Sequence, residues 1–203
     1  MIWSLLRGVL TGAILSGTSL LYATLGEVIV ERSGIVNLGL EGVLLVGAST
    51  AFAVASVTGS ALAGVLAAAL AGGLMNLVLG YVVVRRRGNQ LAAGLALMFF
   101  GLGVSALVGR PFVGGIITGL RTVRVRMGGA AVLPVDILVL CAVPVAVLVW
   151  WALFRTRWGL EVRAVGEDPA VAYAAGRDPE LLRLEALFAG GLLGGVGGAH
   201  LSV

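Results

Sequence analysis

The chain has 203 residues, of which 59% are hydrophobic and only 12% are charged, and its mean hydropathy is +1.07. An ordinary soluble domain is about 25% charged, so this composition excludes that class. The net charge of +4 comes from fourteen basic residues, all arginines, scattered between apolar runs, which is typical of membrane topology signals and not of a nucleic-acid-binding surface.

Six apolar runs are each at or near the roughly 20 residues that cross ~30 Å of hydrocarbon as a helix. Their lack of period-two alternation excludes a barrel. We therefore predict an all-α, polytopic transmembrane bundle of about six spans that forms one domain, residues 1–203. In chain order the expected spans are Gly8–Gly26, Gly34–Gly59, Ser60–Val84, Gly88–Gly109, Ile137–Phe154 and a sixth that begins near Ala186.

The connection Gly26–Gly34, which carries Glu27, Glu31 and Arg32, is expected to be a cytoplasmic turn. Small residues recur at four-residue spacing within the spans, a pattern that lets membrane helices approach closely. Two such rows are Gly64, Ala68 and Gly72, and Gly190, Gly194 and Gly198. The sequence therefore predicts tight helix packing.

Arginines are unequally divided between the two ends of the expected spans. Nine fall on one side and five on the other, so the nine-arginine side is expected to be cytoplasmic and the amino terminus outside. The outer loop Arg110–Leu133 holds four arginines and no acid. This loop is either an exception to the positive-inside tendency or a basic surface that meets an acidic face of a binding protein.

Several kinds of catalytic site are absent from the sequence. The chain has no lysine, which excludes a P-loop of the form GxxxxGK[ST]. One histidine, His200, and one cysteine, Cys141, cannot build a zinc site, and no serine nucleophile elbow is present. We therefore predict no catalytic and no metal-binding residues, and a protein that is not an enzyme.

A few polar residues interrupt the apolar spans. Asn37 and Glu41 lie four residues apart, which predicts one face of a shared helix. Ionisable groups inside a membrane are costly, so Glu41 is a candidate for a substrate pathway, with a structural pairing role as the alternative. Asn76, Asn89 and Gln90 would suit the hydroxyls of a sugar or the edges of a nucleobase, or would join helix to helix.

A hydrophilic segment at residues 155–185 carries eleven of the twenty-four formal charges. Asp168 followed by Pro169 is a good helix start, and Gly176 is a matching stop. Between them Ala170–Ala175 predicts about two helical turns with small side chains. On these residues alone, a short helix that inserts into a groove on another protein and a merely solvated loop both remain open.

Three stretches resemble a known family: GEVIVERSGIVNLGLEGVLLVGA, GNQLAAGLAL and RTRWGLEVRAVGEDPAVAYAAG, at residues 26–48, 88–97 and 155–176. They resemble the permease subunits of bacterial ABC importers of the simple-sugar and nucleoside branch, related to the branched-chain amino acid permeases. The resemblance covers essentially the whole chain in the same order. Members of the family are usually about half as long again, so we expect this chain to be shortened at its C-terminus.

The resemblance implies a multi-pass subunit of the bacterial inner membrane that moves substrate while a separate cytoplasmic ABC ATPase binds ATP and Mg²⁺. No cofactor is expected in this chain itself. The implied partners are that ATPase, a second permease subunit, identical or related, an extracytoplasmic solute-binding protein and the lipid bilayer, with no nucleic acid. The implied ATPase-coupling residues are Arg163, Gly166, Glu167, Asp168, Pro169, Ala172, Ala175 and Gly176.

Nucleosides are the first expected substrate, simple sugars the second and branched-chain amino acids the third, a ranking that follows from the resemblance. A membrane scaffold or assembly factor without a pathway is the alternative from another functional class. Co-purification of an ATPase with the chain would separate the two.

Overall fold

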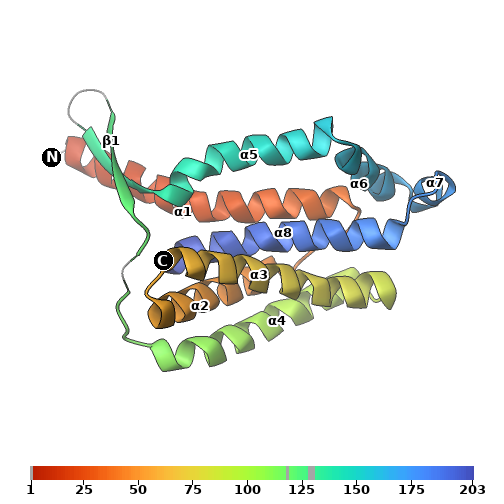
Figure 1. Ribbon diagram of the computed structural model, residues 1–203, viewed down its shortest axis with the longest axis horizontal. Helices are drawn as coiled ribbons and strands as arrows, with labels where there is room; N and C mark the ends of the chain where they lie inside the picture. Colours follow the sequence, from red (N-terminus) through yellow and green to blue (C-terminus); the bar gives the residue numbers. More distant parts are fainter. Residues whose placement is uncertain (1, 118, 128–130) are drawn as a thin grey trace.

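The computed structural model describes residues 2–117, 119–127 and 131–203, and most of them are α-helical (Figure 1). Within these described residues, six helices are long and apolar enough to cross a membrane, as the sequence predicts. The long helices are α1 (Ile2–Arg32), α2 (Leu40–Thr58), α3 (Ala61–Gly80), α4 (Gln90–Gly109), α5 (Ile137–Arg155) and α8 (Pro179–Ser202). The shorter elements are η1 (Tyr81–Arg85), η2 (Arg110–Phe112), the strands β1 (Thr122–Met127) and β2 (Ala131–Asp136), α6 (Arg157–Glu167) and α7 (Pro169–Ala174).

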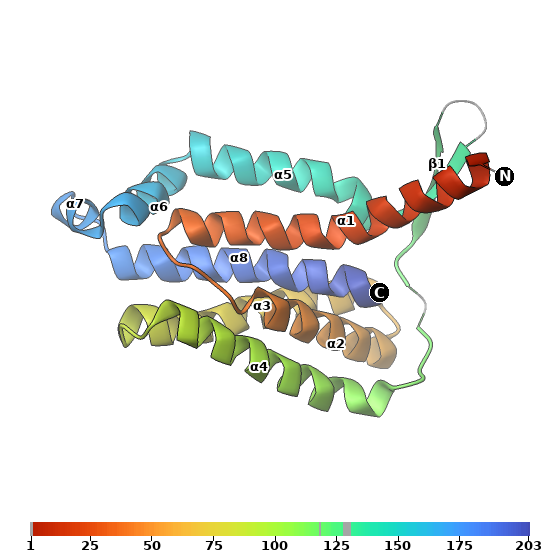
Figure 2. The same ribbon diagram turned by 180° about the vertical axis from the view of Figure 1, so that it is seen from behind.

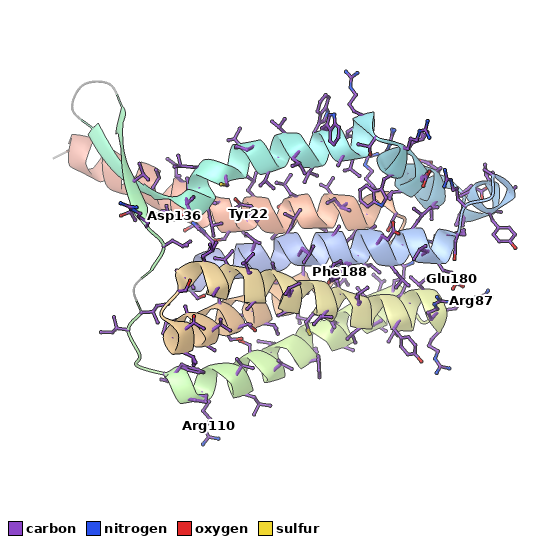
Figure 3. All side chains as sticks on the ribbon, in the orientation of Figure 1. Tyr22, Arg87, Arg110, Asp136, Glu180 and Phe188 are labelled. Carbon is purple, nitrogen blue, oxygen red and sulfur yellow. The ribbon has the colours of Figure 1, made fainter. Side chains whose placement is uncertain are left out.

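The long helices run side by side along the long axis of the molecule (Figures 1 and 2). α1 and α8 lie in the middle, with α5 on one side and α2, α3 and α4 on the other. The β1–β2 hairpin lies at one end, here called the hairpin end, and α6 and α7 lie at the other, here called the α7 end. Figure 3 places Arg87 and Glu180 near the α7 end, and Arg110 and Asp136 near the hairpin end. The nine arginines expected on one side lie in or beside the connections at the α7 end.

α8 packs against α1, α2 and α3 through a row of glycines. Cβ atoms added at Gly72 and Gly191 would each collide with the other's carbonyl oxygen, and one added at Gly47 would lie 2.7 Å from the Gly195 carbonyl oxygen. One added at Gly198 would lie 2.9 Å from the Ala48 nitrogen. Any larger side chain would force these helices apart, so the predicted tight packing is confirmed, with helices of the same chain as the partners.

α1 extends further than the sequence analysis predicts. Gly26 does not end the helix but packs against the backbone of Gly190, and α1 continues through Glu27 to Arg32. The predicted cytoplasmic turn over Gly26–Gly34 is therefore wrong for most of its length. The chain turns only at Gly34, whose φ of +83° is a left-handed conformation that favours glycine.

α8 also begins earlier than the predicted start near Ala186. Asp178 caps it, because its Oδ1 accepts hydrogen bonds from the Glu180 and Leu181 nitrogens at 2.9 and 3.3 Å, and Pro179 is the first helical residue. The hydrophilic segment 155–185 is therefore α6, α7 and the first turns of α8, and not one loop.

The hairpin is an element that the sequence analysis missed. β1 and β2 pair antiparallel, with Thr122 opposite Asp136 and Val125 opposite Leu133. The alternation of apolar and basic residues in TVRVRM is the usual signal of a strand with two different faces. The predicted basic outer loop Arg110–Leu133 thus includes most of this hairpin. Residues 118 and 128–130 of the loop lie outside the described residues.

Candidate functional site

The predicted short helix after Asp168 is present as α7. Asp168 caps it, with Oδ1 accepting from the Ala170 nitrogen at 2.8 Å, and Pro169 is its first residue. The helix ends at Ala174, Ala175 is its C-terminal cap, and Gly176 follows with a φ of +77°. The start and stop signals in the sequence are confirmed as structural features.

α7 is seated on its neighbours by one small residue. Ala172 is 4% exposed and packs in a small cluster with Val165 of α6 and Leu182 of α8. Val171 and Tyr173, on either flank of Ala172, are 62% and 73% exposed. A helix of two turns that is fixed by one buried residue and leaves two large side chains exposed can serve as a docking element.

α6 connects this end of the molecule to the turn between α1 and α2. A Cβ atom at Gly166 would collide with the Arg32 carbonyl oxygen, and one at Gly34 would lie 3.2 Å from the Gly166 Cα. On the other side of the turn, Arg183 Nε of α8 donates to the Ser33 carbonyl oxygen at 3.2 Å. The turn is therefore held between α6 and α8, so a displacement of α6 would press directly on the end of α1.

Side-chain contacts also hold the α7 end together. Ion pairs join Arg177 to Glu161 at 2.7 Å and Arg85 to Glu180 at 2.9 Å. Trp158 Nε1 of α6 donates to Glu185 Oε2 of α8 at 2.9 Å. Exposed pairs of this kind contribute at most about 1 kcal/mol each, so their main effect is on orientation.

The two remaining predicted coupling residues lie on α6. The Arg163 guanidinium lies 5.0 Å from the centre of the Phe154 ring, and Glu167 is exposed at the helix end. Beside α7 a groove of about 720 Å³ runs toward η1 and the start of α4. It is lined by Val83, Val84, Arg87, Gly88, Gln90, Pro169, Ala170, Tyr173, Asp178, Pro179, Glu180 and Arg183.

Two of the predicted pathway residues meet in a polar network inside the bundle. Asn37 Nδ2 donates to Asn76 Oδ1 at 3.2 Å, and Asn76 Nδ2 donates to the Leu187 carbonyl oxygen at 3.0 Å. The Asn37 backbone nitrogen donates to Glu27 Oε1 at 3.2 Å. Asn37 and Asn76 are 5% and 1% exposed. The network therefore joins α1, the α1–α2 turn, α3 and α8 in the region that the sequence predicts to be apolar.

Glu27 is a residue that the sequence analysis assigned to a turn. Its Oε2 is buried and is the one buried side-chain oxygen or nitrogen of the described residues without a hydrogen-bond partner. Buried polar atoms are rarely left unsatisfied, so a further hydrogen-bond donor at this oxygen would be stabilising. The signal in the sequence was an acid one residue after a glycine in an apolar run.

The prediction that Asn37 and Glu41 share one helical face is wrong. α2 begins at Leu40, because Asn37 Oδ1 accepts from the Gly39 nitrogen at 2.9 Å and holds the chain in a turn before the helix starts. Glu41 is exposed in the first turn of α2. Its spacing from Asn37 therefore does not bring the two side chains together.

The other two predicted pathway residues satisfy backbone groups at the α7 end. Asn89 Oδ1 caps α4 by accepting from the Ala92 nitrogen at 3.1 Å. Gln90 Oε1 accepts from the Val36 nitrogen at 3.0 Å and so joins α4 to the α1–α2 turn. These contacts favour the structural alternative for Asn89 and a bridging position for Gln90.

A second polar network at the hairpin end was missed from the sequence. His200 Nδ1 lies 2.7 Å from Ser19 Oγ, and His200 Nε2 lies 3.0 Å from Asp136 Oδ2. Asp136 also caps α5, since its Oδ1 accepts from the Val139 nitrogen at 3.0 Å. The cap was visible as an acid before an apolar run, but its pairing with a histidine 64 positions away was not.

Comparison with known proteins identifies the family of this chain. The family described as branched-chain amino acid transport system, permease component, matches residues 9–203. A Haloferax volcanii protein named as a glucose ABC transporter permease is 36% identical over 98% of this chain and 64% of its own length. No solved structure matches the chain.

Two further relatives carry names from nucleoside transport. A guanosine ABC transporter permease of Bacillus subtilis is 30% identical, over 88% of this chain and 62% of its own length. A nucleoside ABC transporter permease of Lactococcus lactis is 32% identical, over 96% of this chain and 67% of its own length. The chain thus spans about two thirds of the length of these relatives.

Proposed function

Because the chain belongs to the permease-component family of branched-chain amino acid transport systems, we propose that it is the membrane-spanning permease subunit of an ABC importer. In this proposal ATP is hydrolysed by a separate cytoplasmic subunit, and this chain is not an enzyme. The observation that carries the proposal is the mounting of α7, with its exposed Val171 and Tyr173, at the end of the bundle that collects nine of the fourteen arginines.

The mechanical route of coupling follows from the contacts of α6. An ATPase that binds α7 and displaces it would also displace α6, because the two helices pack together through the cluster of Ala172, Val165 and Leu182. α6 in turn abuts the α1–α2 turn at Gly166, where backbone meets backbone with no flexible side chain to absorb the displacement. The turn leads through Asn37 to Asn76 and α8. A motion at the α7 end would thereby reach the centre of the bundle.

The proposed cargo is a nucleoside first and a simple sugar second. Two of the three relatives are named for guanosine or nucleosides and one for glucose. Both classes offer hydroxyls that donate hydrogen bonds, and the buried Glu27 Oε2 is an acceptor without a donor. Glu41, in the first turn of α2, and Asn89, the cap of α4, are predicted pathway residues that remain exposed. Branched-chain amino acids stay the third choice.

The proposed partners are the ATPase at the α7 end, a solute-binding protein at the hairpin end, and a second permease subunit that packs beside this one in the membrane. The arginines in the sequence of the outer loop Arg110–Leu133 would complement an acidic surface of that binding protein. The proposed location is the bacterial inner membrane with the α7 end in the cytoplasm, since arginine-rich connections favour that side.

Purification of the chain with the products of its neighbouring genes tests the proposal. Importer function predicts that an ABC ATPase co-purifies and that a nucleoside-loaded binding protein stimulates ATP hydrolysis in reconstituted vesicles. A scaffold predicts neither. If the ATPase co-purifies but only a sugar or an amino acid stimulates hydrolysis, the importer proposal stands and the substrate ranking is wrong.

A further inference from the structure

Three arginines gather around the aromatic residues at the end of α5. The Arg32 guanidinium of α1 lies 5.8 Å from the centre of the Phe154 ring, and that of Arg163 from α6 lies 5.0 Å from the same centre. Arg155 lies 5.6 Å from the centre of the Trp150 ring. Cations from α1, α5 and α6 thus meet at one corner of the α7 end, held over aromatic faces.

These arginines have no acidic partner within the described part of the chain. Its ion pairs within 4.0 Å involve Arg85, Arg177 and His200. Of the three arginines at the corner, Arg163 uses only its Nε in a hydrogen bond, which it donates to the Gly159 carbonyl oxygen at 3.3 Å. Most of the guanidinium donors at this corner therefore remain available for an anion.

A groove of about 580 Å³ lies beside these cations, between the end of α1 and α6. Arg32, Arg163 and the apolar Leu160 line it, and Glu31 and Glu167 line it as well. Neither carboxylate approaches an arginine closely enough to form an ion pair. The groove lining therefore holds two cations and two carboxylates, and Arg155, over the Trp150 ring, adds a third cation at the end of α5.

The surface of α5 next to the corner is suited to lipid. Trp150 and Trp151 are 51% and 55% exposed in the last turns of a span whose mean hydropathy is 2.7. Tryptophan side chains favour the boundary between hydrocarbon and headgroups. A molecule that satisfies both surfaces must carry a negative charge at the arginines and apolar chains along the tryptophans.

We propose that this corner binds an anionic phospholipid, with its phosphate held by Arg32 and Arg163 and its acyl chains against Trp150 and Trp151. Planar guanidinium groups match phosphate oxygens in charge and geometry. Basic pockets at helix ends bind anionic headgroups in this way. A lipid is favoured over free phosphate because the cations stand directly beside the exposed tryptophans. The proposal rests on the chain spanning a membrane and not on what it transports.

The bound lipid would stabilise the contact between Gly166 and the α1–α2 turn. Arg32 precedes that turn and Arg163 lies one helical turn before Gly166. A phosphate that holds both arginines would fix the end of α1 to α6. Anionic lipid would then stabilise the α7 end in the position that the structure shows.

Quenching of tryptophan fluorescence tests the site, because Trp150 and Trp151 would contact the bound acyl chains. The chain is reconstituted in phosphatidylcholine vesicles that contain increasing fractions of either brominated phosphatidylglycerol or brominated phosphatidylcholine. We expect the apparent association constant to be about thirty-fold higher for the anionic lipid, since the two basic contacts near a surface are each worth about 1 kcal/mol. Equal quenching by the two lipids would overturn the proposal.

Matched variants separate a site from general attraction. Arg32→Gln with Arg163→Gln should abolish the preference, while Arg110→Gln with Arg121→Gln removes the same charge at the other end and should keep it. Arg32→Lys with Arg163→Lys retains the charges and should preserve part of the preference, which controls for misfolding. A preference that survives the double glutamine variant, or that is lost equally in the Arg110 and Arg121 variant, would contradict the proposal.

Discussion

The side-chain amide of Asn37 donates to the side-chain carbonyl of Asn76 at 3.2 Å, inside the bundle and 39 positions apart in the sequence. The same Asn76 donates onward to the Leu187 carbonyl oxygen. A single residue of α3 therefore holds the α1–α2 turn and α8 together. Because little water is present inside a membrane bundle, water cannot easily replace these hydrogen bonds if they are lost.

Replacement of Asn76 by leucine should destabilise the chain. The change leaves the Asn37 amide and the Leu187 carbonyl oxygen without their partners, and such a loss costs about 1–3 kcal/mol. The measurement is thermal unfolding of the purified chain in detergent. Thr24→Val is the control, because Thr24 is exposed and, among the described residues, its hydroxyl bonds only to Leu20 of its own helix. Equal thermal stability of the two variants would show that the Asn37–Asn76 network does not stabilise the chain.

Replacement of Gly166 by alanine should impair coupling between the two ends of the bundle. The added methyl collides with the Arg32 carbonyl oxygen, and overpacking of this kind costs about 1–3 kcal/mol. We expect ATP hydrolysis in the complex to respond less to the loaded binding protein. Gly103→Ala is the control, since no atom lies within 4 Å of its added methyl. Normal stimulation of ATP hydrolysis in the Gly166 variant would show that coupling does not pass through the contact between Gly166 and the α1–α2 turn.

Replacement of Val171 by aspartate should weaken binding of the ATPase. Val171 is exposed on the outer side of α7, and a central interface residue is worth about 2 kcal/mol, or roughly thirty-fold in affinity. Titration of the ATPase onto the reconstituted chain measures the effect. Val113→Asp introduces the same charge at an exposed position of the hairpin end and should leave the affinity unchanged. A similar loss in both variants would place the interface elsewhere.

Two substitutions of Asp136 should separate its two roles. Asp136→Asn can keep the cap on the Val139 nitrogen while it weakens the contact with His200, and Asp136→Ala loses both. We expect the alanine variant to unfold more easily by about 1 kcal/mol, the usual contribution of a cap. Thermal unfolding in detergent measures this difference. Identical unfolding of both variants would show that the cap contributes nothing to stability.

The sequence was sufficient for the number of spans and for the local signals around α7. Six long apolar runs can only be helices in lipid, and the pair Asp168 and Pro169 followed by Gly176 defines the ends of a helix through backbone geometry alone. These features depend on neighbours in the sequence. The functional roles assigned to the residues around α7 remain predictions.

What the sequence did not reveal depends on distant partners. Asn37 and Asn76 stood out as polar residues in apolar spans, but the four-residue spacing predicted that Asn37 shares a helical face with Glu41. The actual neighbours are Asn76 and Glu27, which only the packing of α1 and α3 brings close. Gly26 likewise resembled a helix end, although it is the contact point for Gly190.

Accessibility of one cysteine at position 173 tests the position of α7 most directly. In a Cys141→Ser background, Tyr173→Cys is exposed to a membrane-impermeant maleimide in intact cells and in inverted vesicles. We predict labelling only in the inverted vesicles, and protection from it when the ATPase is bound. Labelling in intact cells would place α7 outside the cell and contradict its role as the docking element of a cytoplasmic ATPase.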